Sequence, residues 1–319
     1  MSPICSIVIR AFNEEKHIGK LLDGIHHQTI KDLQIILVDS GSTDRTVEIA
    51  EEFGAEVVHI QPQDFTFGRS LNLGISHARS DLVVFASAHV YPVYPDWIER
   101  LLEPFEDEKV AISYGKQRGM QTTQFSEHRI FEHWFPDGST TNQSHPFCNN
   151  ANAAIQKKLW LQHSYNETLP GLEDLEWAKW IFDQGYKITY VAEAEIIHVH
   201  NESWRGISNR YRREAMAFKL IYPNEQFNLF DLFNAFFSNV KNDFLIAKKD
   251  KIIKKVWKSI IGFRWNQFYG TYLGYRQSGP LTWQLKQTFY YPRNGHPANT
   301  KVRDVKPILY QDQSGKDFE

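Results

Sequence analysis

The chain has little cysteine, no excess charge of one sign and no long apolar run. Cys5 and Cys148 are its two cysteines, far apart in 319 residues, which excludes a disulfide scaffold and a cysteine metal motif and is typical of a reducing cytosol. The formal net charge is −2, so no nucleic-acid partner is expected. The N-terminal segment lacks signal-peptide features, and no apolar run of about 18 residues predicts a transmembrane helix. We therefore expect a cytoplasmic protein.

Two common nucleotide-binding loops are also missing. Neither the glycine-rich fingerprint of dinucleotide binding nor a phosphate-binding loop follows the first apolar run. Instead, strand patterns at 6–9, 34–38, 57–60 and 82–86 alternate with helical patterns at 18–25, 47–53 and 68–78. Asn13 is predicted to cap the first of these helices. Such alternation predicts an α/β fold with a mostly parallel sheet.

Polar residues follow two of the predicted strands. Ser87 and His89 end the run at 82–86, and Asp39 ends the second strand. Because open α/β sheets bind ligands at the carboxyl ends of their strands, these residues are candidates for a binding site. Two alternatives stay open: His89 as a strand-end histidine bonded to backbone, and Asp39 as a residue that only shapes its turn.

A second group of candidates lies between residues 149 and 177. Glu173 and Asp174 open a predicted helix, where they either complement the helix dipole or provide a general base. Asn150 and Asn152 suit sugar hydroxyls, which need both donors and acceptors, or serve as turn residues. Trp177 is either a stacking platform for a sugar ring or a core residue.

Together these motifs resemble glycosyltransferase family 2, the inverting enzymes that use nucleotide sugars and have a GT-A fold. The resemblance covers roughly residues 4–215. Its motifs, in order, are Ser6-Ile7-Val8-Ile9-Arg10-Ala11-Phe12-Asn13-Glu14-Glu15, Asp39-Ser40-Gly41-Ser42-Thr43-Asp44, Gly68-Arg69-Ser70-Leu71-Asn72-Leu73-Gly74 and Glu173-Asp174. Further segments at 114–117, 149–152 and 198–200 are similar to rhamnosyltransferase-like members.

The resemblance implies a role for each candidate. Asp174, with Glu173, would be the catalytic pair, and Asp174 would take the proton from an acceptor hydroxyl in a single inverting displacement. The nucleotide would be bound by Arg10, Phe12, Glu14, Asp39, Arg69, Asn72 and Ser87. The donor or acceptor sugar would be bound by His89, Gln117, Asn150, Asn152, Trp177 and Arg205.

The chain departs from the family at the metal site. The family carries Asp-x-Asp where this chain has Ser87-Ala88-His89, so Mg²⁺ loses its carboxylate anchor. Three outcomes are open. His89 binds a softer cation such as Mn²⁺ together with His198 or His200, which share one strand face. Alternatively no metal binds and Arg or Lys side chains neutralise the diphosphate, or the donor is a nucleoside monophosphate sugar.

The C-terminal third has a different character. Aromatic residues at 227–237 precede a lysine-rich stretch at 241–258, which predicts amphipathic helices. We therefore divide the chain into a catalytic domain (1–215), a helical extension (216–290) and an extended tail (291–319). The extension either packs on the catalytic domain or a second subunit of a homodimer, or lies on the inner face of a membrane. Membrane contact would suit a lipid-linked acceptor.

Two other functional classes compete with an active glycosyltransferase. The first is a degenerate member that binds a nucleotide sugar or glycan without turnover, which the missing Asp-x-Asp favours and the retained Glu173-Asp174 pair disfavours. The second is a nucleotidyltransferase, whose first loop is rich in glycine and lysine, whereas residues 10–15 are acidic here.

Overall fold

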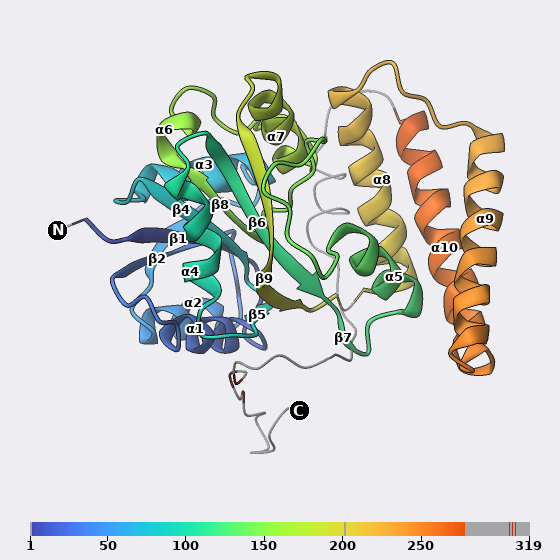
Figure 1. Ribbon diagram of the computed structural model, residues 1–319, viewed down its shortest axis with the longest axis horizontal. Coiled ribbons are helices and arrows are strands. Elements are labelled where there is room, and N and C mark those ends of the chain that lie inside the picture. The colour runs from blue at the N-terminus through green and yellow to red at the C-terminus, as the bar shows by residue number, and fades with distance from the viewer. Residues whose placement is uncertain (1, 201, 278–305, 307, 309, 311–319) are drawn as a thin grey trace.

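The computed structural model of the chain describes residues 2–200, 202–277, 306, 308 and 310. A central sheet carries helices on both faces, and helices α8, α9 and α10 stand together at one side (Figure 1). The order of its eight strands is β3-β2-β1-β4-β8-β6-β9-β5. Their bounds are β1 Cys5–Ala11, β2 Leu33–Asp39, β3 Glu56–His59, β4 Leu82–Ser87, β5 Val90–Pro92, β6 Val110–Arg118, β8 Asn152–Gln156 and β9 Lys187–His198. A short strand, β7 (Met120–Gln121), lies outside this order.

The first four strands are parallel, as the sequence predicts. β1 pairs with β2 and β4, and β2 pairs with β3. The connecting helices are α1 (Ile18–His26), α2 (Thr46–Glu52) and α3 (Phe67–His77). Side chains alternate across β1, so Ile7 and Ile9 enter the core on one face and Val8 the core on the other. Burial on both faces explains the continuous apolar runs.

The second half of the sheet is mixed. β8 is antiparallel to both β4 and β6, whereas β9 is parallel to β6. The β6–β9 register shifts after Gly115, where a Cβ atom would lie 2.1 Å from the Ala194 carbonyl oxygen. Only glycine allows this backbone approach. The strand that carries His198 in the sequence is β9, which is twelve residues long and ends at His198, so His200 lies just beyond it.

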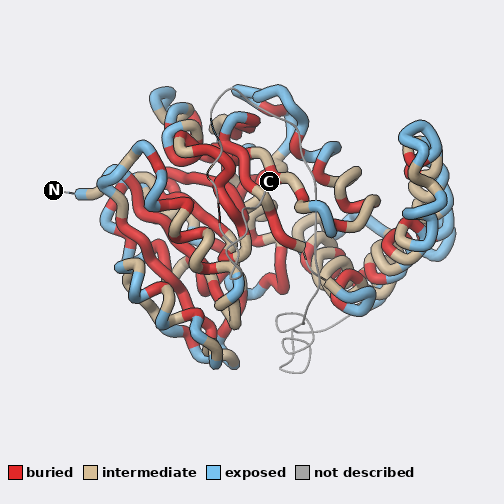
Figure 2. Tube along the Cα trace, turned by 90° about the horizontal axis from the view of Figure 1, so that it is seen from below, coloured by how far each residue is buried: buried red, intermediate tan, exposed pale blue. Residues whose placement is uncertain are grey.

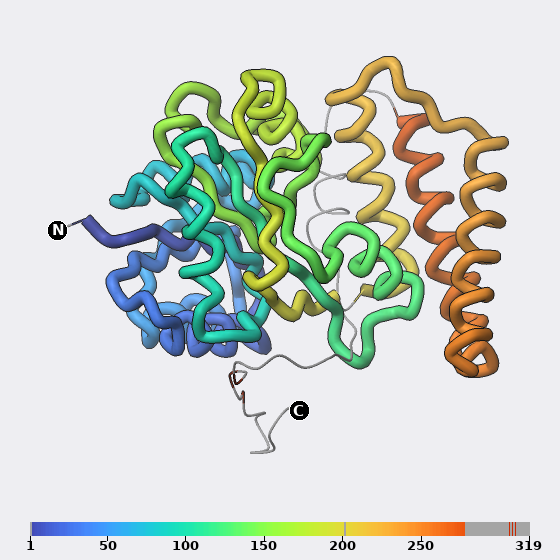
Figure 3. The backbone as a smooth tube through the Cα atoms, viewed as in Figure 1, coloured from blue at the N-terminus to red at the C-terminus, as the bar shows by residue number. Residues whose placement is uncertain are grey.

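The remaining helices cover the sheet and border the candidate site. α4 (Trp97–Leu102) continues into a 3₁₀ turn, Glu103–Glu106. The others are α5 (Phe125–Trp134), α6 (Lys157–Trp160) and α7 (Glu173–Asp183). Figure 3 shows α5 lying between the sheet and the C-terminal helices. α5 therefore connects the sheet with the helical extension, and its Ser126 hydroxyl donates to Asp243 of α9 at 2.6 Å.

The prediction that Asn13 caps the first helix is wrong. Asn13 has a left-handed backbone with φ of 54°, and α1 begins at Ile18. The Asn13 side-chain oxygen accepts a hydrogen bond from the Thr43 N–H at 2.8 Å, and its own N–H donates to Ser42 Oγ at 2.9 Å. Asparagine tolerates this backbone because its short side chain bonds locally. It thereby joins the loops after β1 and β2.

The predicted helical extension is present. It comprises α9 (Leu229–Lys249) and α10 (Ile253–Arg276), and α8 (Trp204–Ile221) precedes it. Gly270 and Gly274 bring α10 against the carbonyl oxygens of Ser208 and Arg212 in α8. The predicted boundary at residue 215 thus falls inside a helix that packs on the extension. Within the described residues, no helix is long and apolar enough to cross a membrane.

Burial separates the two parts of the molecule. Figure 2 shows mostly buried residues in the sheet, apart from its edge strand β3, and mostly exposed residues on α9. The predicted tail at 291–319 lies largely outside the described residues. Of that tail, Tyr310 is described and buried, and its hydroxyl donates to the Pro92 carbonyl at 2.9 Å. At this point the chain returns to the β5 edge of the sheet.

Candidate functional site

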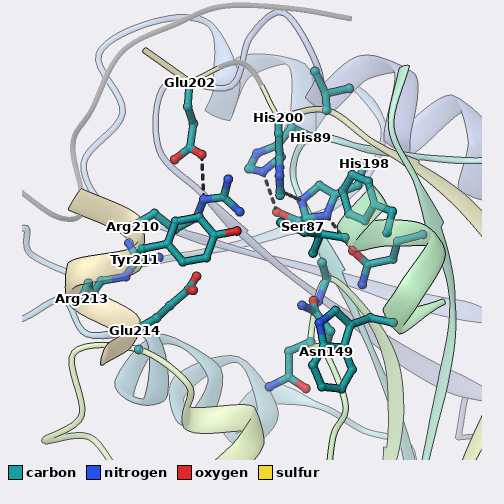
Figure 4. A pocket seen from close by; sticks show the side chains of 18 of the residues that line it. Ser87, His89, Asn149, His198, His200, Glu202, Arg210, Tyr211, Arg213 and Glu214 are labelled. Carbon is teal, nitrogen blue, oxygen red and sulfur yellow. Dashed lines mark hydrogen bonds and ion pairs between the residues drawn. The ribbon is translucent and has the colours of Figure 1, made fainter. Parts of the chain in front are cut away.

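A large cavity lies at the carboxyl ends of β1 and β4 and extends towards α5, α8, α9 and α10. Its volume is about 1890 Å³. A pocket for one small ligand has roughly 300–1,000 Å³, so this cavity has room for two substrates. Figure 4 shows the histidines gathered beside Ser87, with the side chains of α8 facing them. The labelled residues are Ser87, His89, Asn149, His198, His200, Glu202, Arg210, Tyr211, Arg213 and Glu214.

Asp174 enters the cavity from the first turn of α7. Leu172, with a left-handed φ of 55°, turns the chain into this helix. One Asp174 carboxylate oxygen accepts from the Asn150 N–H at 3.2 Å and the other from the Leu175 N–H at 2.8 Å. Burial, and then the neighbouring Glu173 carboxylate, raise the pKa of Asp174 to about 7. Asp174 is therefore suited to exchange a proton near neutral pH.

Glu173 has a different environment from Asp174. It is 4% exposed and pairs with Arg10, whose Nη1 lies 2.9 Å from Glu173 Oε1. The Arg10 guanidinium lies 4.7 Å from the centre of the Phe67 ring, and the Arg213 guanidinium lies at the same distance from that ring. These contacts hold Glu173 beside Asp174 as a fixed negative charge.

Three histidines line a second part of the cavity, here called the histidine wall. The Nδ1 atoms of His89, His198 and His200 lie 2.7–2.8 Å from Glu14 Oε1, Gln117 Oε1 and Glu127 Oε1, respectively. The His89 ring stacks on the His198 ring, with 5.2 Å between their centres. Because carboxylate and amide oxygens only accept hydrogen bonds, each Nδ1 carries the hydrogen and each Nε2 faces away from its oxygen partner.

The Nε2 atoms of His198 and His200 face each other at 3.2 Å. With both Nδ1 positions protonated, these two nitrogens share either one further proton or a metal ion. Burial, and then the neighbouring His200, lower the pKa of His198 well below its ordinary value, so a shared proton does not reside on His198. The two Nε2 atoms are also candidate ligands for a transition ion, with the oxygen partners as outer-shell support.

A third ligand from the protein does not join this pair. Across the described residues, no group of three His, Cys, Asp or Glu side chains converges as a metal site. The His89 Nε2 atom instead lies 3.2 Å from Ser87 Oγ. Although burial opposes protonation, the Glu14 carboxylate outweighs it and raises the pKa of His89. His89 thus fits the metal-ligand prediction less well than His198 and His200 do.

A buried charge network joins the histidine wall to α8. Glu127 accepts from both His200 and Arg210, and Arg210 also pairs with Glu202 at 2.7 Å. Despite burial, the Arg210 and His200 partners lower the pKa of Glu127. Glu127 is therefore a carboxylate at neutral pH, and it fixes the orientation of both partners.

The family model described as Glycosyl transferase family 2 matches residues 6–168, just over half of the chain. The chain belongs to glycosyl transferase family 2. Relatives include the O-antigen chain rhamnosyltransferase RfbN of Salmonella typhimurium, 26% identical over 65% of this transferase and 69% of the relative. The O-antigen chain rhamnosyltransferase WbaN of Salmonella anatum is 29% identical over 58% of this transferase, which spans 62% of that relative.

Solved structures show the same fold as this transferase. The mannosyltransferase PcManGT from Pyrobaculum calidifontis, in complex with GDP-Man and Mn²⁺, aligns with a TM-score of 0.61 at 15% identity, over 85% of this chain and 86% of its own. A glucosyl-3-phosphoglycerate synthase from Mycobacterium tuberculosis, in complex with Mn²⁺, UDP and glucosyl-3-phosphoglycerate, aligns at 0.53 and 22% identity, over 69% and 80%. The transferase therefore has a GT-A fold.

Most of the predicted site residues of the transferase line the cavity. They are Arg10, Phe12, Glu14, Ser87, His89, Gln117, Asn150, Glu173, Asp174, His198 and His200. Among the described residues, no partner lies within hydrogen-bonding reach of the buried Nε2 of Gln117 or Nδ2 of Asn150. Because both residues line the cavity, these amide donors suit ligand oxygens, as expected for sugar hydroxyls.

Other predicted residues serve the fold. Trp177 is 1% exposed and donates from Nε1 to the His163 carbonyl at 2.6 Å, so it is a core residue and not a sugar platform. The Asn152 amide bonds to Trp97, Lys116 and Ala194. The Asn72 amide likewise bonds to Trp160, Tyr165 and Glu167. Neither amide is left to bind substrate.

Three further predicted residues lie outside the cavity lining. Arg69 is half-exposed near Asp64 and Glu167, and Arg205 is exposed on α8. Asp39 is buried, and its carboxylate accepts from the Gly41 and Ser42 N–H groups at 3.1 Å. In this structure Asp39 shapes the loop that presents Ser40 and Thr43 to the cavity.

The structure also adds residues that sequence reasoning missed. Arg210 and Arg213 of α8 and Arg129 and Trp134 of α5 line the cavity. The arginines recur at helical spacing in residues 210–213, which is a usable signal only once α8 is known to face the site. Nothing near Trp134 in the sequence marks it as a cavity residue.

Proposed function

We propose that this transferase moves a sugar from a nucleotide-sugar donor to a hydroxyl of a glycan or lipid-linked acceptor, in one inverting displacement with Asp174 as general base. The environment of Asp174 carries the proposal. Its carboxylate lies in the cavity, accepts two backbone hydrogen bonds and has a pKa of about 7. A base with a pKa near the working pH is largely deprotonated and still accepts a proton well.

In this mechanism Asp174 takes the proton of the acceptor hydroxyl while the oxygen of that hydroxyl attacks the anomeric carbon of the donor sugar. The bond from that carbon to the donor phosphate breaks as the new bond forms, through a transition state with oxocarbenium character. The Glu173 carboxylate pairs with Arg10 beside it. Its charge strengthens the proton affinity of Asp174.

The leaving phosphate needs positive charge. Arg129, Arg210 and Arg213 line the cavity, and arginine suits phosphate oxygens. A divalent transition ion such as Mn²⁺, held by His198 and His200, would add Lewis-acid stabilisation of the leaving group. The Nε2–Nε2 separation of 3.2 Å supports this ion, and the absence of a third ligand in the described residues makes it weakly held.

The relatives suggest the substrate class. RfbN and WbaN are O-antigen chain rhamnosyltransferases, so we propose a nucleotide-activated deoxyhexose as donor and a surface polysaccharide as the acceptor glycan. A cavity with room for two ligands, lined by the amides of Gln117 and Asn150, supports a carbohydrate acceptor.

The outer face of the helical extension supports a membrane-bound acceptor. Phe230, Phe233, Phe237, Trp257 and Trp265 are exposed on α9 and α10. Residues 248–258, at the turn between these helices, contain six lysines and a single acidic residue. Aromatic rings beside a basic cluster complement an anionic lipid surface, and we propose that this face binds the membrane peripherally. Pairing with a second copy of the chain is the competing outcome.

A binding protein without turnover is the second candidate function. Ser87-Ala88-His89, which lacks the Asp-x-Asp carboxylates, favours it. Against it, Asp174 keeps a base-like environment that binding alone does not need. Turnover separates the two functions.

The test is to incubate the protein with a panel of nucleotide sugars and a lipid-linked glycan acceptor, with Mn²⁺ or EDTA. Transfer with inverted anomeric configuration, determined from proton coupling constants of the product, is the expected result. Nucleotide-sugar binding without any product across the panel would establish the binding protein instead.

A further inference from the structure

An exposed tryptophan stands at the cavity rim. Trp134 ends α5, lines the cavity and is 41% exposed. Its indole nevertheless has a fixed position, because it stacks on the Phe147 ring with 4.3 Å between centres and 20° between planes. His133 and His145 contact it edge-on at 5.1 and 6.4 Å. Phe147 covers one face of the indole, and surface remains for a second ring.

A short stretch of chain links Phe147, the ring on which Trp134 stacks, to the proposed general base Asp174. Phe147 precedes Cys148, whose thiol lies 3.5 Å from the Asp174 carbonyl oxygen, and the Asn150 N–H donates to the Asp174 carboxylate. Three residues of chain span at most about 11 Å. The ring that supports Trp134 is therefore close enough to Asp174 for one oligosaccharide to touch both.

We propose that Trp134 is the stacking platform of an acceptor subsite, on which one sugar ring of the acceptor glycan lies while a hydroxyl of that glycan meets Asp174. This inference rests on the proposed function and specifies its acceptor as an oligosaccharide rather than a small alcohol or a protein side chain. An indole provides a rigid apolar face for the C–H side of a sugar, at low entropic cost.

Other parts of the cavity suit the rest of such a glycan. Asn239 and Asn242 of α9 and Gln267 of α10 line it, and these helices meet α5 at Ser126, near the opposite end of that helix from Trp134. Amides present both donors and acceptors, as sugar hydroxyls require. The helical extension would then contribute one wall of the acceptor subsite.

The experiment uses the full chain and three simple probes. Methyl α-L-rhamnoside, methyl α-D-mannoside and methyl α-D-galactoside are tested for saturation transfer from protein aromatic protons, and nucleoside diphosphates are titrated by calorimetry. Trp134→Ala is compared with Trp134→Phe and with Trp204→Ala. Trp204 is a matched control because it is 43% exposed at the start of α8, outside the cavity lining.

We expect Trp134→Ala to weaken glycoside binding about tenfold, Trp134→Phe to weaken it less, and Trp204→Ala to leave it unchanged. Nucleotide affinity should be the same in all variants, which also shows that they fold. Three results would overturn the role of Trp134 as a platform. They are equal saturation transfer in Trp134→Ala and the unmodified protein, no glycoside signal in either protein, and a loss of nucleotide binding rather than glycoside binding. A protein that binds no nucleotide would instead contradict the proposed function.

Discussion

The two long walls of the cavity differ in how they hold their reactive groups. On one wall, Asp174 is positioned by backbone N–H groups of Asn150 and Leu175. On the other, His198 and His200 are positioned by side-chain oxygens of Gln117 and Glu127. Backbone donors fix the carboxylate without neutralising it, and burial raises its proton affinity. Side-chain acceptors fix the imidazole tautomers and direct Nε2 outward, so this wall is suited to bind a cation.

The variant with the largest expected effect removes only the proton-accepting carboxylate of Asp174. Asp174→Asn keeps the shape of the side chain but cannot take up a proton. Its single amide oxygen can accept from only one of the Asn150 and Leu175 N–H groups, so one backbone contact is kept. General-base catalysis contributes about 10²–10⁴-fold, so we expect kcat to fall about 10³-fold while nucleotide-sugar affinity stays unchanged in calorimetry.

The matched control for that variant is Asp183→Asn. Asp183 belongs to the same helix, is half-exposed and pairs with Lys179 on the surface. It should retain full activity. If Asp174→Asn and Asp183→Asn turn over equally fast, the catalytic role of this wall is refuted.

The histidine wall is tested next. His198→Ala combined with His200→Ala removes both Nε2 atoms, and Lewis-acid stabilisation is worth several kcal/mol, so Mn²⁺-dependent kcat should fall at least about 100-fold. In calorimetry with MnCl₂, the double variant should show no heat of Mn²⁺ binding. His77→Ala is the control, because His77 is exposed on α3 and pairs with Glu56. Mn²⁺ binding that survives the double substitution, or full wild-type activity in EDTA, would contradict the cation site.

The smallest predicted effect concerns the exposed face of the extension. Lys254→Ala with Lys255→Ala removes two charges from the α9–α10 turn. At about 1 kcal/mol per basic residue, partitioning onto phosphatidylglycerol vesicles should fall about 30-fold, with transfer to a soluble acceptor unaffected. Co-sedimentation measures this. Binding that is equal on neutral phosphatidylcholine vesicles, or dimerisation through this face in solution, would argue against an anionic surface.

The fold was predictable because local and global signals agree in the first half of the chain. Continuous apolar runs such as 82–86 are strands buried on both faces, and helical spacing in 68–78 marks α3. Asn13 was mispredicted because tertiary bonds to Ser42 and Thr43 override its capping preference. Such contacts between loops leave no local pattern.

The site was predictable where chemistry depends on neighbours in sequence. Glu173 and Asp174 lie side by side, and His198 and His200 are two residues apart. Helical phase explains the misses. Trp177 is four residues after Glu173, so both residues lie on the buried side of α7. Asp174, the residue after Glu173, is turned towards the cavity.

The same reasoning applies to α8. Arg210 follows Arg205 by five residues, a rotation of about 140° at 3.6 residues per turn. Arg210 therefore lines the cavity and Arg205 does not. Which side of a helix faces a site is decided by packing, here by the contact of α8 with Gly270 and Gly274 of α10.

The central claim is that a carboxyl group with a near-neutral pKa accepts the proton, and the pH dependence of single-turnover transfer tests it most directly. Because Asp174 must be deprotonated to act, the rate should rise about tenfold per pH unit below its pKa of about 7 and level off above it. A rate that is constant from pH 5 to 8, or that levels off near the ordinary aspartate pKa of about 4, would contradict the assignment of Asp174 as a base tuned by burial and by Glu173.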